Sequence, residues 1–294
     1  MKQPKILCYG SLNIDYVYQV NKIFKPGETI ESRSMQIFAG GKGANQSIAV
    51  ARAGGHVHHA GRIGKDDEWI LSGLKSEGVN VDKIVRSDAV TGHAVIQVDA
   101  DGENAICIHG GANHSIEKSD IDETIGGFEA GSILMLQNET NELAYMLRTG
   151  ADRNMFICLN ASPISDSLLA LDMSDVRLLV VNESEAAALT FNSGDEFRKL
   201  KDRCPRAIIV KTMGSQGGEA LAPDSDNVIV YHSREVKAVD TTAAGDTFLG
   251  YLVTGLSQDE PLESALNTAA KAAEHCIKVR GAQTSIPLRN KIIF

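Results

Sequence analysis

The hydrophobic positions of this chain fall into short continuous runs that alternate with amphipathic segments. Residues 43–53 are typical of the second kind, because Ala44, Ile48 and Ala51 recur on one helical face and two glycines follow. Strands that are apolar on both faces, with helices between them, predict a parallel sheet covered on both sides. The continuous apolar runs lie at residues 5–9, 133–136, 155–159, 178–181 and 207–210.

Two regions depart from this succession of apolar runs and amphipathic segments, because apolar and polar residues alternate within them. They are residues 15–20 and 91–98, and the second turns at 99–102 and returns through 104–109. An Asp-Gly turn between alternating segments predicts a β-hairpin. We therefore expect a small antiparallel sheet with one free face, attached to the main parallel sheet rather than tethered by a linker.

Two helices are predicted near the C-terminus. The apolar run after Gly245 indicates a helix that begins near Ala244. In the second helix Pro261 suits the first turn, small apolar residues keep the helical period up to Cys276, and Gly281 follows the end. The alternation of strands and helices thus continues through the chain and predicts an α/β fold.

Composition and charge narrow the possible partners. The 294 residues are 43% hydrophobic and 23% charged, which allows a sizeable globular core. The formal net charge of −9 disfavours nucleic acid or an anionic membrane as partner, although a local site for a small anion remains possible. No apolar run approaches about 18 residues, so we expect no membrane-spanning helix.

Cysteine usage and the N-terminal segment indicate a reducing compartment. The first ten residues contain no apolar signal region and no cleavage pattern, and the cysteines form no C-x-x-C pair. We therefore expect a cytoplasmic protein with small buried thiols. The five cysteines are Cys8, Cys107, Cys158, Cys204 and Cys276.

The first candidate for chemistry is the segment AVDTTAAGDTFLG, residues 238–250, which places only small residues between Asp240 and Asp246. Backbone N–H groups at a helix N-terminus are unpaired and favour an anion, so a phosphoryl group could approach there. Asp246 would face that anion and could accept a proton from an attacking hydroxyl group. The segment alone does not distinguish this role from simple helix capping by Asp246.

The second candidate is the glycine-rich segment FAGGKGANQ, residues 38–46. It is not a Walker loop, because Gly43 stands where Ser or Thr should follow the lysine. It also lacks the dinucleotide fingerprint, since Gln46 occupies the last glycine position, and this disfavours a dinucleotide-dependent oxidoreductase. Lys42 and Asn45 suit the recognition of hydroxyl groups, whereas a plain glycine turn before a helix is the alternative.

Five segments follow one another in an order that is also found in a known family. They are GSLNID at 10–15, GGKGANQ at 40–46, NESE at 182–185, KTMGSQG at 211–217 and DTTAAGD at 240–246. With these segments the chain resembles the ribokinase-like (PfkB-type) carbohydrate kinases over nearly its full length. The resemblance implies a three-layer α/β/α core with a mainly parallel sheet, and a small antiparallel β lid.

The same resemblance implies how the chain is divided. The lid would close over a sugar and exclude the water that would otherwise accept the phosphoryl group. A homodimer formed through the lid is also expected, and the free face of the lid sheet gives it a physical reason. The core would comprise residues 1–13, 39–91 and 110–294, and the lid residues 14–38 and 92–109.

For the reaction, the resemblance implies transfer of the γ-phosphoryl group of ATP to a sugar hydroxymethyl group, with D-ribose converted to D-ribose 5-phosphate. Asp246 would be the catalytic base, and the backbone amides of Ala243, Ala244 and Gly245 would form an anion hole. The sugar-binding residues implied by the family are Asn13, Asp15, Gly41, Lys42, Asn45, Glu139 and Asp246.

The resemblance also assigns residues to the nucleotide and its metal. Asn182 and Glu185 would meet the phosphates and Mg²⁺, the glutamate through a water molecule. Ala270 stands where many members of the family carry a polar side chain near the adenine. The residues implied to bind ATP are Asn182, Glu185, Thr212, Gly214, Gly217 and Gly245.

A monovalent cation site is implied beside the anion hole. In members of the family that use K⁺, a loop next to the anion hole binds the ion and partly offsets the charge gathered there. A turn capped by Asp240 is the alternative interpretation. The residues that match the K⁺ site are Asp240, Thr242, Cys276, Val279, Gly281 and Ser285.

Other functions remain open from the sequence. Within the family, the substrate could be another sugar or a nucleoside, such as deoxyribose or fructose, although Glu139 and the segment 108–113 favour ribose. A different class is a catalytically idle sugar-binding regulator on the same fold. The intact Asp246 and the small residues before it argue against that regulator.

Overall fold

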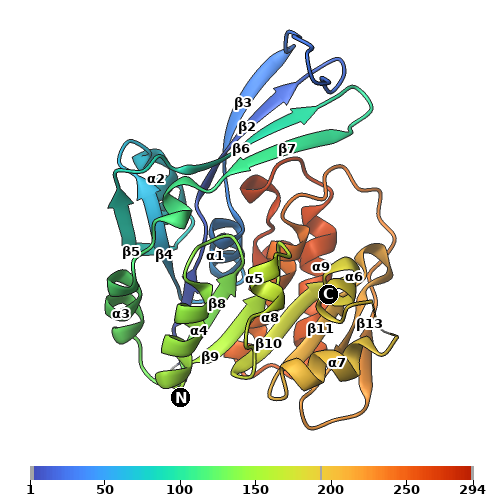
Figure 1. Cartoon of the computed structure of the whole chain (residues 1–294). Coiled ribbons are helices and arrows are strands. Elements are labelled where there is room, and N and C mark those ends of the chain that lie inside the picture. The colour runs from blue at the N-terminus through green and yellow to red at the C-terminus, as the bar shows by residue number, and fades with distance from the viewer. Residues whose placement is uncertain (1–2, 193, 293–294) are drawn as a thin grey trace.

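The computed structural model describes residues 3–192 and 194–292, and its main element is a large central sheet (Figure 1). Neighbouring strands from β5 to β11 pair in parallel, whereas β11–β12 and β12–β13 are antiparallel. The mainly parallel sheet is therefore confirmed. In spatial order its strands are β13 (Val228–Tyr231), β12 (Gly218–Leu221), β11 (Ile208–Thr212), β10 (Val176–Asn182), β9 (Phe156–Asn160), β8 (Ile133–Gln137), β1 (Ile6–Tyr9), β4 (Val57–Gly64) and β5 (Asn80–Ser87).

Helices cover both faces of this sheet, as the continuous apolar strands require. Two separate apolar clusters result, one on each face, and together with the sheet they form the predicted three layers. One face carries α1 (Lys42–Arg52), α2 (Glu68–Ser76), α8 (Ala244–Ser257) and α9 (Leu262–Cys276). The other carries α3 (Lys118–Gly126), α4 (Leu143–Asp152), α5 (Asp166–Leu169), α6 (Glu183–Leu189) and α7 (Glu196–Arg203).

A smaller sheet projects from one end of the molecule (Figure 1). The pairs β2–β3 and β6–β7 are antiparallel, as the alternating pattern predicts. The two inner strands β2 and β6 pair in parallel, because a long stretch of chain separates them. The proposed division of the chain into core and lid stays a prediction. The strands of the small sheet are β3 (Ser34–Gly40), β2 (Asn13–Gln19), β6 (Gly92–Val98) and β7 (Asn104–His109).

The helices that bear on the site begin and end close to the predicted residues. Helix α1 covers Lys42–Arg52, α8 begins at Ala244, and α9 follows Pro261 and ends at Cys276. Helices α1 and α8 pack against each other through Ala49 and Gly250, where a Cβ on the glycine would lie 2.4 Å from the alanine Cβ. None of the described helices has the length and apolar character needed to cross a bilayer.

Candidate functional site

The first turn of α1 lies directly against the link between β1 and β2, and glycines make this possible. Gly41 has φ of +95°, and a Cβ there would lie 2.8 Å from the carbonyl oxygen of Ser11. A Cβ on Gly43 would lie 2.6 Å from the backbone of Gly10. The glycine-rich segment therefore brings Lys42 and Asn45 to the carboxyl end of β1, rather than forming a nucleotide loop.

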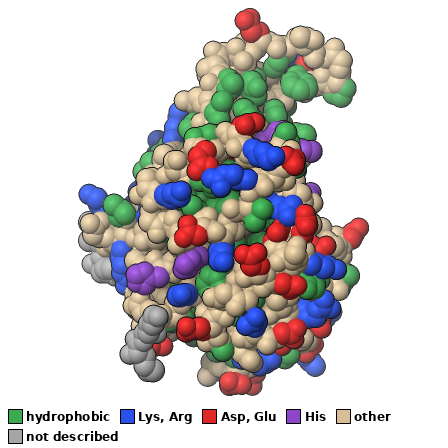
Figure 2. All heavy atoms as spheres, turned by 90° about the vertical axis from the view of Figure 1, so that its left-hand side faces the viewer, with side chains coloured by type: hydrophobic (Ala, Val, Ile, Leu, Met, Phe, Trp, Pro, Cys, Tyr) green, Lys and Arg blue, Asp and Glu red, His purple; other side chains and the backbone are tan. Residues whose placement is uncertain are grey.

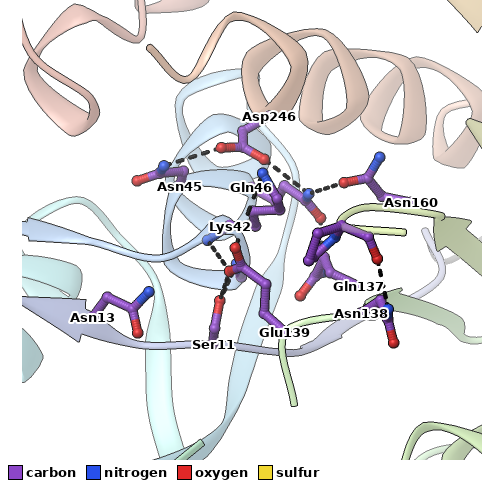
Figure 3. Close-up of polar contacts among 12 residues, drawn as sticks. Ser11, Asn13, Lys42, Asn45, Gln46, Gln137, Asn138, Glu139, Asn160 and Asp246 are labelled. Carbon is purple, nitrogen blue, oxygen red and sulfur yellow. Dashed lines mark hydrogen bonds and ion pairs between the residues drawn. The ribbon is translucent and has the colours of Figure 1, made fainter. Parts of the chain in front are cut away.

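Asp246 is the centre of the site and lies buried in the first turn of α8 (Figure 3). Its Oδ2 accepts a hydrogen bond of 3.0 Å from Asn45 Nδ2, and its Oδ1 accepts one of 2.9 Å from Gln46 Nε2. Burial raises the pKa of Asp246, while the positive charge of Lys42 and the two amide donors oppose that rise. A carboxylate with a raised pKa beside a lysine can act as a general base.

Glu139, in the loop after β8, ties α1 to the link before β2. Its Oε2 accepts hydrogen bonds from the hydroxyl of Ser11 and from the backbone amide of Lys42, the latter at 3.0 Å. The Lys42 ammonium lies 4.0 Å from Glu139 Oε1. Burial alone would lower the pKa of Lys42, but the carboxylates of Asp246 and Glu139 more than offset this and raise it. Lys42 is therefore a permanent cation between two carboxylates.

The predicted sugar residues Asn13 and Asp15 lie on one face of β2, two positions apart. Burial and the nearby charge of Glu139 raise the pKa of Asp15 to about 6. Gly40, which pairs with Asn13 on the neighbouring strand β3, leaves the room that the Asp15 side chain occupies, since a Cβ there would lie 2.2 Å from the Asp15 Oδ2. The structure thus gathers the predicted sugar-binding side chains around Lys42.

Asn113 is a residue of this cluster that the sequence analysis did not single out. Its Nδ2 donates to Asn13 Oδ1 at 2.7 Å, and its Oδ1 accepts from the backbone amide of Leu12 at 3.0 Å. It lies in the single turn Gly111–His114, just after the strand β7. The only sequence signal was its place in the segment 108–113, because nothing local shows that it reaches back to β2.

A cavity of about 400 Å³ lies on the other side of Asp246, between β11, β13, α8 and α9. It contains four of the predicted ATP residues, Thr212, Gly214, Gly217 and Gly245. Ala270 also lines it and supplies no polar group there. The predicted nucleotide loop and the N-terminus of α8 therefore share one concave site.

Asn182 and Glu185 cap the helix α6. Asn182 Oδ1 accepts from the Glu185 amide and Glu185 Oε2 accepts from the Asn182 amide, each at 2.8 Å. Neither residue lines the cavity, but the charge of Glu185 acts on Lys42. Their predicted role at the phosphates and at Mg²⁺ stays a prediction beside this capping role.

The N-terminus of α8 is open where an anion would approach. Ala243 has φ of +61°, and the Ala244 amide donates to the Thr241 carbonyl group at 3.3 Å. A Cβ built on Gly245 meets no heavy atom within 4 Å. The first amides of a helix have no intrahelical acceptor, so this end offers donors and free space together.

The residues predicted for a monovalent cation lie together beside this helix end. Asp240 accepts hydrogen bonds from the amide and the hydroxyl of Thr242, at 2.9 and 2.6 Å, and from the amide of Gly281 at 2.9 Å. Burial raises the pKa of Asp240, but these bonds more than offset it and leave that pKa below its ordinary value.

Cys276, at the end of α9, belongs to the second group of residues predicted for the cation. Its thiol lies 3.1 Å from the hydroxyl of Ser285 and donates to the Thr242 carbonyl oxygen at 3.6 Å. The exposed side chain of Val279 is a hydrocarbon without a ligand atom, so only its backbone carbonyl group could bind an ion. In the described part of the chain, no group of three or more His, Cys, Asp or Glu side chains could hold a metal ion.

Comparisons with known proteins agree with this geometry. The model of the pfkB family carbohydrate kinases matches residues 3–289. A bifunctional ribokinase/ribose-5-phosphate isomerase A of Fructilactobacillus sanfranciscensis is 34% identical over 98% of this chain, which spans 55% of that longer protein. A ribokinase of Dictyostelium discoideum is 31% identical, with 99% of both chains covered. The crystal structure of a ribokinase of Cryptococcus neoformans in complex with ADP superposes with a TM-score of 0.87, at 33% identity and with 98% of both chains covered.

Proposed function

This chain belongs to the pfkB family of carbohydrate kinases, and we propose that it transfers the γ-phosphoryl group of ATP to the hydroxymethyl group of D-ribose, forming D-ribose 5-phosphate and ADP. The observation that carries the proposal is the position of Asp246. This buried carboxylate accepts hydrogen bonds from Asn45 and Gln46 of α1 (Figure 3), and the preceding Gly245 lines the cavity at the N-terminus of α8. The names of the relatives support ribose as the acceptor and a nucleotide as the second ligand.

In the proposed reaction Asp246 accepts the proton of the sugar hydroxyl group as its oxygen attacks the γ-phosphorus atom. The bond from that phosphorus to the bridging oxygen breaks, and ADP leaves with the electron pair. The amides of Ala243, Ala244 and Gly245 receive the negative charge that develops on the phosphoryl oxygens. The ammonium of Lys42, on which the charge of Asp246 acts, adds a positive charge to the same region.

The sugar is held by groups that differ in hydrogen-bonding character. The carboxylates of Asp15 and Glu139 accept bonds from sugar hydroxyl groups, and one carboxylate can accept two at once. Asn13, Lys42 and Asn45 offer donors, and Gly41 lets the start of α1 lie close to the backbone of Ser11 and Asn13. Because Asn45 Oδ1 is buried and finds no hydrogen-bond partner among the described residues, it is a ready acceptor for a sugar hydroxyl group.

Mg²⁺ and K⁺ are the proposed cofactors besides ATP. Glu185 uses Oε2 for the helix cap, so its other carboxylate oxygen can bind a water molecule of the Mg²⁺ shell, with Asn182 near the phosphates. When bound, Mg²⁺ would neutralise part of the negative charge of the phosphates. K⁺ suits the loop of Asp240, Thr242, Cys276, Val279, Gly281 and Ser285, because carbonyl, hydroxyl and carboxylate oxygens meet there.

We also propose a homodimer formed through the lid, and function in the cytoplasm. The lid sheet exposes large apolar side chains on both faces, with Ile37 and Val95 on one face and Ile106 and Ile108 on the other. A face of that kind is covered in an assembly more often than it is left in water. All five cysteines are free thiols, which suits a reducing compartment.

The test is ADP release with Mg-ATP and K⁺ across a panel of ribose, deoxyribose, fructose, other sugars and nucleosides. We expect ribose to be the best acceptor, with the product phosphorylated at O5. A different preferred acceptor would keep the mechanism and reassign the specificity of the Asn13, Asp15, Lys42 and Glu139 cluster. Sugar binding without any turnover would favour the idle regulator.

The residues proposed to bind K⁺ lead to a separate prediction. Because Asp240 and Thr242 hold the segment that leads into the anion hole, an ion bound there stabilises its charge. Replacing K⁺ by Na⁺ in the ADP-release assay should lower the rate. Equal rates in the two salts would contradict an activating site.

A further inference from the structure

A chain of buried side-chain amides lies beneath Asp246 (Figure 3). Gln137, the last residue of β8, donates from Nε2 to Gln46 Oε1 at 2.7 Å. Gln46, in α1, donates from Nε2 to Asp246 Oδ1 at 2.9 Å and more weakly to Asn160 Oδ1 at 3.4 Å. Gln46 and Gln137 are only 0% and 1% exposed. The base is thus connected to the ends of two central strands by amide groups alone.

The direction of each hydrogen bond in this chain is fixed. An ionised carboxylate can only accept, so Gln46 must present its Nε2 to Asp246 and its Oε1 to Gln137. Gln137 must then present its own Nε2, which leaves its Oε1 against Gly10, where a Cβ would lie 2.1 Å away. That oxygen is buried and has no hydrogen-bond partner among the described residues. Neither glutamine can turn over without breaking a bond.

Such an arrangement is costly if it serves packing alone. A buried amide with an unsatisfied oxygen destabilises the fold by about 1–3 kcal/mol, whereas an apolar side chain would fill the same space without that cost. The two neighbours in α1 also differ. Asn45 bonds Oδ2 of Asp246 and belongs to the sugar cluster, while Gln46 bonds Oδ1 and points into the core. The row of buried amides therefore holds Oδ1 of Asp246, whereas Oδ2 lies with the sugar cluster and can meet the sugar.

We propose that Gln46, oriented by Gln137, is a positioning residue that holds Oδ1 of Asp246 and so presents Oδ2 to the hydroxyl group of the acceptor. This inference rests on the proposed kinase function. The Gln46 donor also stabilises the ionised form of the base. The charged groups that act on Asp246 are Lys42 from α1 and Glu139 from the loop after β8, with the thiols of Cys8 and Cys276 nearby. None of them replaces a donor on Oδ1.

The experiment is the pH dependence of the single-turnover rate of phosphoryl transfer, measured by rapid quench at saturating ribose and Mg-ATP. Saturation removes the titration of Asp15 from the profile, because the sugar site is then filled. In Gln46→Met the acid limb should move up by about one pH unit, and the plateau rate should fall by about tenfold. In Gln137→Met, Gln46 keeps its donor but loses its fixed orientation, so the limb should move in the same direction by less.

Ser47→Ala is the matched control. Ser47 follows Gln46 in α1 and is equally buried, but its hydroxyl bonds His59 Nδ1 at 2.8 Å rather than Asp246. The acid limb of the pH–rate profile of Ser47→Ala should coincide with that of the unmodified chain, even if the melting temperature of the variant falls. Thermal denaturation of each variant separates loss of fold from loss of orientation.

The possible results separate the inference from the proposed function. Acid limbs unchanged in both glutamine variants, with turnover abolished in Asp246→Asn, would overturn the role of Gln46 and leave the kinase intact. A limb that moves equally in Ser47→Ala would also overturn it. If Gln46→Met does not fold, Gln137→Met decides alone. No transfer to any sugar by the unmodified chain would refute the proposed function itself.

Discussion

The two sides of Asp246 are built in opposite ways. On the sugar side, polar side chains bond one another before any ligand arrives, as in the pairs Asn113–Asn13 and Asn45–Asp246. On the proposed nucleotide side, the cavity is lined by glycines and alanines together with larger side chains such as Tyr231, Arg234 and Phe248, and Ala270 offers no polar group there. We therefore expect sugar binding to weaken when a polar group is removed, and nucleotide binding to weaken when an atom is added.

The difference follows from what each side must bind. Sugar hydroxyl groups carry donors and acceptors at fixed positions, so side chains of fixed orientation recognise them. A phosphate presents several equivalent oxygens, and bare amides at a helix N-terminus suit it without side-chain geometry. Four predictions test this contrast, beginning with the residue that both sides share.

Asp246→Asn should have the largest effect, because the amide cannot accept the hydroxyl proton. Turnover should fall by roughly 10²–10⁴-fold, while ribose affinity, measured by calorimetry, should change little. The ADP-release assay gives the turnover. Turnover near that of the unmodified chain would remove Asp246 from the role of base.

Gly245→Ala should impair the use of ATP, because it adds one methyl group on the nucleotide side. The new Cβ meets nothing within 4 Å in the protein, so the fold should be stabilised by about 0.5–1 kcal/mol, as expected for Gly to Ala inside a helix. The methyl group would occupy space meant for the phosphoryl group, and kcat/KM for ATP should fall by up to about 10²-fold.

Gly73→Ala provides the control for that effect. Gly73 lies in α2, and a Cβ there also meets nothing within 4 Å. The melting temperatures of the two variants should rise together, and only Gly245→Ala should lose activity. Equal kcat/KM values for ATP in both would show that the space at Gly245 is not used.

Asn113→Ala should weaken sugar binding, because it removes one amide group on the sugar side. Asn13 would lose the bond that fixes its amide, and ribose affinity should fall by about tenfold, as expected for one hydrogen bond of about 1–1.5 kcal/mol. The KM for ATP should stay unchanged. Kinetics with each substrate varied in turn would show the split.

Asn141→Ala is the matched control for Asn113. Asn141 Oδ1 accepts from the Ile116 amide at 3.0 Å and its Nδ2 donates to the Ile116 carbonyl group at 2.9 Å, much as Asn113 clamps Leu12. It makes no hydrogen bond to Asn13. The two variants should lose similar stability, but only Asn113→Ala should weaken ribose binding.

The last prediction concerns pH. The pKa of Asp15 is raised to about 6, so its carboxylate is ionised above that pH and protonated below it. The ionised form accepts two hydroxyl bonds, so ribose binding without nucleotide should weaken as pH falls through 6, by about tenfold at pH 5. Calorimetry at several pH values measures this. The same weakening in Asp15→Asn would assign it to another group.

Much of the fold could be predicted because its signals are local. Continuous apolar runs mark β1, β8, β9, β10 and β11, and the apolar run after Gly245 marks α8, which begins at Ala244. Resemblance to a family then supplied most of the site. The parallel pairing of β2 with β6 could not be read from either strand, because alternation gives the faces of a strand and not its neighbours.

The residues that sequence reasoning missed act at long range. Asn113 reaches Asn13 across 100 positions, and Gln46 reaches Asp246 across 200. Glu185 was predicted for the phosphates and Mg²⁺, yet it also closes the cap of α6. Polar residue types alone do not show which partner they will meet.

By itself, the sequence determined the elements and the chemical groups, because hydrophobic period, glycine and helix capping act within a few residues. Only the tertiary structure decided that Asp246 is buried, that burial raises its pKa, and that two amides hold it from α1. Desolvation and hydrogen-bond direction depend on groups brought together from distant parts of the chain, and these exist only once the sheet and both helices have packed.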